Sequence, residues 1–121
     1  MKKILFAMIL LAATWQVSLA QSVTRAAFTA KVNLMDTYIG SSDLTNANAT
    51  FDLIQQMMKQ ALHDNKGNVA TAPDPTTKSA YMSTIQNQGV LFNQIWKLKN
   101  DLATNRAAIR SKLETFELTL D

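Results

Sequence analysis

The sequence contains no cysteine, and among its 121 residues it has only two prolines, three glycines and one histidine. Without cysteine the chain has no disulfide bonds and no thiolate metal ligands. It also lacks the residue on which a bacterial lipoprotein carries its acyl chains. The scarcity of glycine and proline leaves few points at which a helix must break. The stability of the fold must therefore come from the packing of long regular segments.

The N-terminal residues have the pattern of a bacterial export signal. Lys2 and Lys3 form a positive n-region, residues 4–15 an apolar h-region, and residues 18–20 (Ser-Leu-Ala) a small-x-small cleavage site. The apolar run is too short to span a bilayer comfortably, because a spanning helix needs about 20 mostly apolar residues. We expect residues 1–20 to be a signal peptide that is removed on export.

Cleavage leaves residues 21–121 as a single domain and changes its charge. Because Lys2 and Lys3 leave with the signal, ten cations then face nine anions, and the formal net charge falls from +3 to +1. A nucleic-acid-binding domain needs a strong basic field, so we expect no nucleic acid as partner. The expected location is the periplasm or the cell exterior, with no membrane span after cleavage and with peripheral lipid contact left open.

Apolar residues recur at helical spacing from residue 23 onward. Residues 23–39 predict a first helix, closed by Gly40 in the left-handed conformation. From Leu44 the apolar positions alternate in steps of three and four, which is a coiled-coil-like pattern. Lys66 and Gly67 predict the end of this second helix, because a cation suits the helix dipole and a glycine commonly caps the C-terminus.

A loop and then a long apolar stripe follow. Residues 68–77 contain both prolines and predict a connecting loop, in which Asp74 followed by Pro75 restarts the helix. From Tyr81 the stripe continues to Leu120 without a proline, and with no glycine after residue 89. At face value this predicts one C-terminal helix of about 45 residues, near 65 Å long.

Such a helix is far longer than its expected partners, so its second half would lie bare in a three-helix bundle. The sequence leaves two all-α architectures open. In the first, an antiparallel bundle of three helices has a long C-terminal helix that projects and meets another molecule. In the second, the chain turns back near residues 100–105, with Asp101 or Thr104 as a cap, and closes an up-down four-helix bundle. The absence of the usual helix breakers favours the first.

The C-terminal segment also carries the densest charge. Five cations lie within residues 97–112, opposed there only by Asp101. This pattern is typical of a solvated helix face, and secondarily of a patch for an acidic partner or lipid headgroups with Trp96 as an apolar anchor. The candidate partner-binding residues are Trp96, Arg106, Ile109, Arg110, Leu113, Phe116 and Leu120.

No catalytic, cofactor or metal motif stands out. His63 is the only histidine and lies near the end of a predicted helix, where an imidazolium suits the dipole. The aspartates fall mainly at predicted helix ends, where Asp43, Asp74 and Asp101 are explained as caps. We therefore expect no enzyme, no cofactor and no metal.

The overall pattern resembles small exported helical proteins in outline, namely periplasmic chaperones and secretion-machinery or pilus-associated subunits, and no motif transfers a residue role from either. We expect an exported, non-enzymatic interaction protein that contacts itself or a protein partner through its C-terminal helix, consistent with a secretion or surface-assembly subunit. The alternative is a periplasmic chaperone-like bundle, or one that binds an apolar ligand in a wide core containing methionine.

Overall fold

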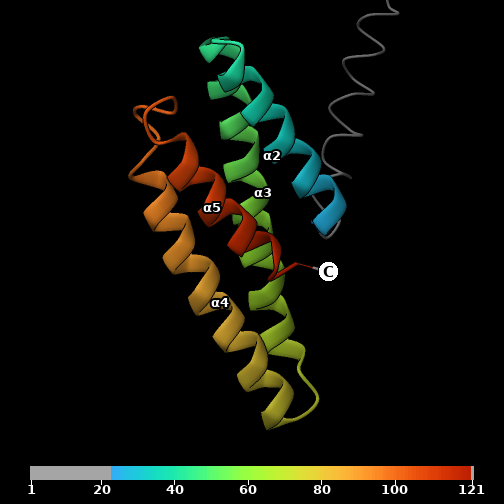
Figure 1. Cartoon of the computed structure of the whole chain (residues 1–121). Coiled ribbons are helices and arrows are strands. Elements are labelled where there is room, and N and C mark those ends of the chain that lie inside the picture. The colour runs from blue at the N-terminus through green and yellow to red at the C-terminus, as the bar shows by residue number, and fades with distance from the viewer. Residues whose placement is uncertain (1–22, 121) are drawn as a thin grey trace, which may run out of the picture.

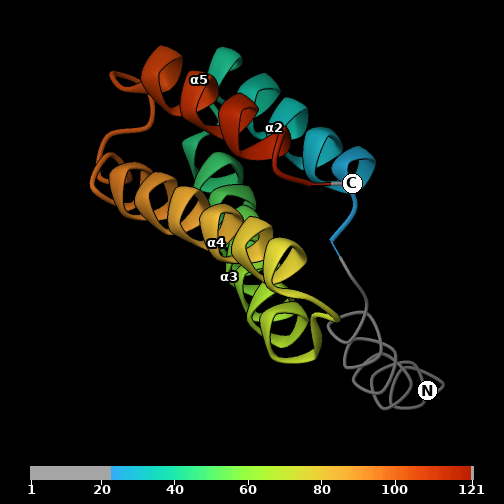
Figure 2. The ribbon, with the colours of Figure 1, turned by 90° about the horizontal axis from the view of Figure 1, so that it is seen from below.

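The computed structural model describes residues 23–120, and within these limits the chain forms four helices and no strand (Figure 1). These are α2 (Arg25–Gly40), α3 (Leu44–Thr71), α4 (Pro75–Trp96) and α5 (Arg106–Glu117). Neighbouring helices pack as a ring in the order α2, α3, α4, α5, and α5 closes the ring on α2 (Figure 2). The expected signal peptide, residues 1–20, lies outside the described residues. The all-α bundle is confirmed in its four-helix form.

The prediction of one long C-terminal helix is wrong, because the chain turns back between α4 and α5. Two side chains satisfy backbone groups in this turn: Asp101 Oδ1 accepts from the Thr104 amide at 3.0 Å, and Asn105 Nδ2 donates to the Leu98 carbonyl at 3.1 Å. Leu102 is buried at its centre. Local polar contacts of this kind compete with helix continuation without glycine or proline, and the turn lets α5 bury its apolar stripe.

The predicted end of the second helix is also wrong. α3 continues through Gly67 and ends at Thr71, so the predicted loop over residues 68–77 shortens to the link before α4. Ala72 stops the helix because it precedes a proline, which disfavours helical backbone. Its ψ of 135° is extended.

Side-chain caps start α3 and α4 as the sequence predicts. Asp43 accepts from the Asn46 amide at 3.2 Å, and Asp74 accepts from the Thr77 amide at 2.7 Å. The second contact holds the pKa of the Asp74 carboxyl below its usual value. The left-handed residue between α2 and α3 is Ser42, with φ of 61°, rather than Gly40.

The core lies where all four helices are present. Its largest fully buried side chains include Phe28 of α2 and Phe116 of α5, whose rings stack with centroids 5.3 Å apart. Beyond this level the α3–α4 hairpin extends past the ends of α2 and α5 (Figure 1), and no residue from 62 to 87 is fully buried. The bundle therefore has a packed end and a thinly covered end.

Polar contacts tie the end of the chain to the other helices. Gln88 has no exposed surface; its Oε1 accepts from Asn65 Nδ2 at 3.0 Å, and its Nε2 donates to Thr119 Oγ1 at 2.9 Å. Arg25 Nη2 donates to the Leu120 carbonyl at 2.7 Å. These bonds satisfy backbone and side-chain groups that would be costly to bury alone.

Candidate partner-binding surface

The apolar residues predicted to bind a partner lie inside the bundle. Ile109, Leu113 and Phe116 have no exposed surface, and Leu120 is nearly covered. Ile109, Leu113 and Phe116 form the buried face of α5, which packs against α2 and α4, and Leu120 follows the end of the helix. A partner could reach these four side chains only if α5 left the bundle, so the surface available for contact must be sought elsewhere.

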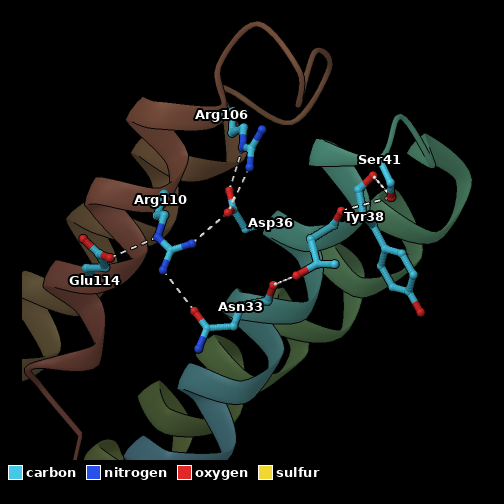
Figure 3. Close-up of polar contacts among 8 residues, drawn as sticks. Asn33, Asp36, Tyr38, Ser41, Arg106, Arg110 and Glu114 are labelled. Carbon is cyan, nitrogen blue, oxygen red and sulfur yellow. Dashed lines mark hydrogen bonds and ion pairs between the residues drawn. The ribbon is translucent and has the colours of Figure 1, made fainter.

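The two arginines of the C-terminal charge run hold α5 against α2 (Figure 3). Arg106 donates to both oxygens of Asp36, from Nε at 2.7 Å and from Nη2 at 3.1 Å, and Arg110 Nη1 lies 2.9 Å from Asp36 Oδ2. The hydrogen bond from Arg106 lowers the pKa of the Asp36 carboxyl, against a smaller opposing effect of burial. The Asp36 side chain is 20% exposed, so this contact is only partly screened by water.

Arg110 also reaches other groups on both helices (Figure 3). Arg110 Nε donates to Glu114 at 3.1 Å, one turn along α5, and its Nη2 donates to Asn33 Oδ1 of α2 at 3.0 Å. Gly40 makes room for the Arg106 guanidinium, because a Cβ there would lie 3.2 Å from Nη2. These two cations therefore serve the fold.

The remaining cations of the run do not form one patch. Lys112 of α5 donates to Gln94 of α4 at 3.2 Å, while Lys99 lies with its Nζ 4.0 Å from the centroid of the Trp96 ring. Within residues 23–120 no ion pair involves Lys97, Lys99 or Lys112. The five cations are thus spread over three places: the α2–α5 contact, the α4–α5 contact at Lys112 and the end of α4.

Trp96 is the one predicted partner-binding residue of apolar character that lies exposed. Its side chain is 44% exposed at the end of α4. It stacks on Phe92, four residues earlier, with centroids 6.3 Å apart, and Lys99 covers part of the ring. An exposed indole that its own helix holds in place loses little entropy on binding, which is a property of interface anchors.

The helix that carries Trp96 is exceptional in its charge. No Asp, Glu, Lys, Arg or His occurs from Ser79 to Trp96, although many side chains in this stretch face solvent. Lys78, in the first turn, is the one charged residue of α4, whereas α2, α3 and α5 carry charged residues at several positions. Solvated helix faces are usually charged, whereas the centres of protein interfaces are depleted of charge and enriched in aromatic residues and methionine. The outer side of α4 therefore has the composition of an interface.

Five residues line up along this side in alternating steps of four and three. We name them the α4 stripe: Met82, Gln86, Gly89, Asn93 and Trp96. Four of them are exposed and Gly89 is half-buried. The alternation of four and three residues is the spacing with which one helix contacts another along its length. The stripe thus presents two large apolar ends, two amides and a central glycine to the outside.

Apolar grooves lie on both flanks of α4. One, of about 260 Å³ between α3 and α4, includes Met82, Ile85 and Val69 among its lining residues. The other, of about 450 Å³ between α4 and α5, includes Val90 and Leu118, which are 55% and 71% exposed. Exposed apolar surface that continues from a helix face into its flanking grooves is characteristic of a protein-binding region.

The described chain offers no comparable arrangement for chemistry. Within residues 23–120 no three or more acidic or histidine side chains converge as metal ligands, and His63 lies exposed on α3. None of the four helices is long and apolar enough to cross a membrane. Comparison with protein-family models, with curated proteins and with solved structures gave no match for this chain.

The outer side of α4 could not be predicted from the two features that placed the candidate site, apolar periodicity and charge density. Apolar periodicity placed the predicted site in residues 102–120, and charge density placed it in residues 97–112. The signal for α4 is an absence, a run of eighteen uncharged residues from Ser79 to Trp96 within a helical pattern. Of the predicted residues only Trp96 belongs to the exposed surface of α4.

Proposed function

We propose that this protein is an exported, non-enzymatic interaction protein that acts through helix–helix contact, with the α4 stripe as the contact surface. The observation that carries the proposal is the exposed, charge-free side of α4 from Ser79 to Trp96. A role as a secretion or surface-assembly subunit is consistent with it. The predicted export signal supports a periplasmic or extracellular location for this contact.

A matched pair of single-charge substitutions tests the proposal. Gln86 of α4 and Gln56 of α3 are both exposed, so changing either to glutamate adds one charge without changing side-chain shape. We expect Gln86→Glu to reduce the native complex to the monomer in gel filtration of cell extracts, because an unpaired charge buried at an interface costs about 3–5 kcal/mol. Gln56→Glu should leave the size of the complex unchanged.

Circular dichroism of both purified variants provides the folding control. Both should keep the helical content of the parent, since each substituted residue lies on the surface. If Gln86→Glu left the complex intact, or if Gln56→Glu dissolved it equally well, the contact surface would not be the α4 stripe.

The groove between α4 and α5 favours a second candidate, a protein that binds an apolar ligand. Met35 and Met58 are buried in the core, whereas the groove beside Leu118 is open and apolar. In this case lipids should displace an apolar dye saturably, and Leu118→Lys should abolish the displacement. Absence of saturable displacement across a lipid panel would exclude this candidate.

A further inference from the structure

A small polar pocket lies where both ends of the described chain meet α3. The last described residues lie beside the start of α2 (Figure 2). The pocket has a volume of about 70 Å³, which is room for a few groups the size of a water molecule. Its lining includes residues from before α2, from α3 and from after α5, namely Val23, Asp64, Asn65, Asn68, Thr119 and Leu120.

One acceptor in this pocket has no donor among the described residues. Asp64 is half-buried, and its Oδ1 accepts from Gln60 Nε2 at 2.8 Å. Its Oδ2 is buried and has no hydrogen-bond partner within residues 23–120. A buried carboxylate oxygen without a donor is costly. The pocket therefore calls for a donor, preferably a cationic one.

The polar neighbours of Asp64 are engaged elsewhere. Asn68 Nδ2 donates to Asn65 Oδ1 at 3.3 Å, and the Thr119 hydroxyl donates to the Phe116 carbonyl at 2.6 Å. No lysine or arginine lines the pocket. The arginine at this end of the molecule, Arg25, donates to three backbone carbonyls of residues 117–120. The charge of Asp64 is thus uncompensated by the side chains around it.

The predicted cleavage site lies close to this pocket along the chain. Cleavage after Ala20 turns the nitrogen of Gln21 from an uncharged amide into an α-amino group, which is mostly protonated at neutral pH. Gln21 is two residues before Val23, which lines the pocket. Two residues span at most about 7 Å, so the new ammonium group comes within reach of Asp64.

We infer that Asp64 forms an ion pair with the α-ammonium group of Gln21 in the processed chain. An ammonium group offers three N–H donors and a positive charge, and hydrogen bonds between charged partners are the strong ones. The contact exists only after cleavage, so processing completes the fold at this pocket. The inference depends on the predicted cleavage and is independent of the α4 stripe.

Other occupants suit the pocket less well. A divalent metal ion would find one carboxylate, and within residues 23–120 no three acidic or histidine side chains converge. A water molecule would give Oδ2 a hydrogen bond but would leave the charge of Asp64 without a partner. The ammonium group provides both.

An N-terminal glutamine allows this partner to be removed without a mutation. In pyroglutamate formation the α-amine attacks Cδ of the same residue, the new N–Cδ bond closes a lactam, and the Cδ–Nε2 bond breaks with loss of ammonia. The lactam is neutral. Glutaminyl cyclase carries out this reaction on proteins that begin with glutamine, so the Gln21 ammonium can be eliminated in the processed chain.

A cycle of cyclisation and substitution tests the ion pair. The chain exported by a bacterial host is first shown by intact mass to begin at an uncyclised Gln21. Urea unfolding is then measured before and after treatment with the cyclase. We expect cyclisation to lower the folding equilibrium constant of the parent about tenfold, between the effects of exposed and buried ion pairs. It should have little effect in Asp64→Asn, where the partner charge is already absent.

The matched control is Asp52→Asn, on the exposed side of the same helix. Cyclisation should destabilise this variant as much as it destabilises the parent. An equal effect of cyclisation in the parent and in Asp64→Asn would overturn the ion pair. So would a loss of stability in Asp64→Asn combined with no effect of cyclisation in the parent, which would assign the pocket to water.

A second measurement needs only the parent protein. An ammonium group held by Asp64 has no free lone pair with which to attack Cδ, so spontaneous cyclisation should be slower in the folded protein than in denaturing urea. Equal rates would overturn the inference, as would recovery of a chain that begins at another residue or is already cyclised. None of these outcomes bears on the contact through the α4 stripe.

Discussion

Asp36 is the residue on which the polar contact between α2 and α5 depends, because it accepts from both Arg106 and Arg110. We expect Asp36→Asn to lower the free energy of unfolding by about 1–2 kcal/mol, since hydrogen bonds between charged groups are strong but these guanidinium groups are partly exposed. Urea denaturation at neutral pH measures the change. Asp52→Asn, on the exposed side of α3, should have little effect, and equal losses in both variants would contradict the role of Asp36.

The same carboxylate gives the fold an acid dependence. Since its pKa is lower in the folded protein than the ordinary value of 3.8, its stabilising contribution is complete above 3.8 and is lost as the pH falls through the lowered value. The difference in unfolding free energy between the parent protein and Asp36→Asn should therefore shrink in strong acid. A difference that stayed constant down to the acid limit of folding would show that the ion pairs are not its source.

Among the helices, α5 closes one side of the core. Phe116 has no exposed surface and stacks on Phe28, so Phe116→Ala should cost about 3–5 kcal/mol of unfolding free energy. Leu118→Ala is the control, because Leu118 directly follows the last residue of α5 but is 71% exposed. If chemical denaturation found the two variants equally stable, α5 would not close the bundle in solution.

The helices could be predicted from the sequence where buried apolar residues recur at helical spacing. Phe28, Val32, Met35 and Ile39 recur at helical spacing, and all four are buried on α2. The ends of helices were harder, because they depend on single contacts. The break before α5 involves two contacts. Asp101, which the sequence offered as a cap, accepts from the Thr104 amide. Asn105 donates to the Leu98 carbonyl seven residues away, and a bond of this kind leaves no periodic pattern in the sequence.

The roles of the glycines were hard to predict, because they depend on surroundings that the sequence does not show. Gly40 was predicted to close the first helix and is the last residue of α2, although the left-handed residue that follows the helix is Ser42. Gly67 was predicted to end the second helix, yet α3 continues to Thr71. Conversely Asp43 and Asp74 were predicted as caps and are caps. Capping by a side chain is a contact within three residues, so it can be predicted from sequence, whereas the packing around a glycine is long-range.

At the scale of the whole molecule, the export signal predicts the mature form. If the signal peptidase cuts after Ala20, the intact mass of the protein recovered from a bacterial host should correspond to residues 21–121. Ala20→Asp should block processing and leave the longer mass in the membrane fraction. Recovery of the unprocessed chain as the main form of the parent protein would contradict the predicted export.

The candidate site could be predicted only in part, because the exposure of each helix face depends on where the chain turns back. The stripe at Ile109, Leu113 and Phe116 would be a partner surface on a projecting helix, but it becomes core once the chain turns back. Closing the bundle then leaves the outer side of α4 as its charge-free surface. The composition of α4 was visible in the sequence, while its exposure depended on the topology.

Site-specific photo-crosslinking in living cells tests most directly whether α4 is the contact surface. A photoreactive residue would replace one exposed residue on each helix in turn: Ala30 of α2, Gln56 of α3, Asn93 of α4 and Ser111 of α5. We predict a cross-linked product of defined mass from position 93 and none from the other three positions. A product from Ser111, Ala30 or Gln56 with none from Asn93 would contradict the account.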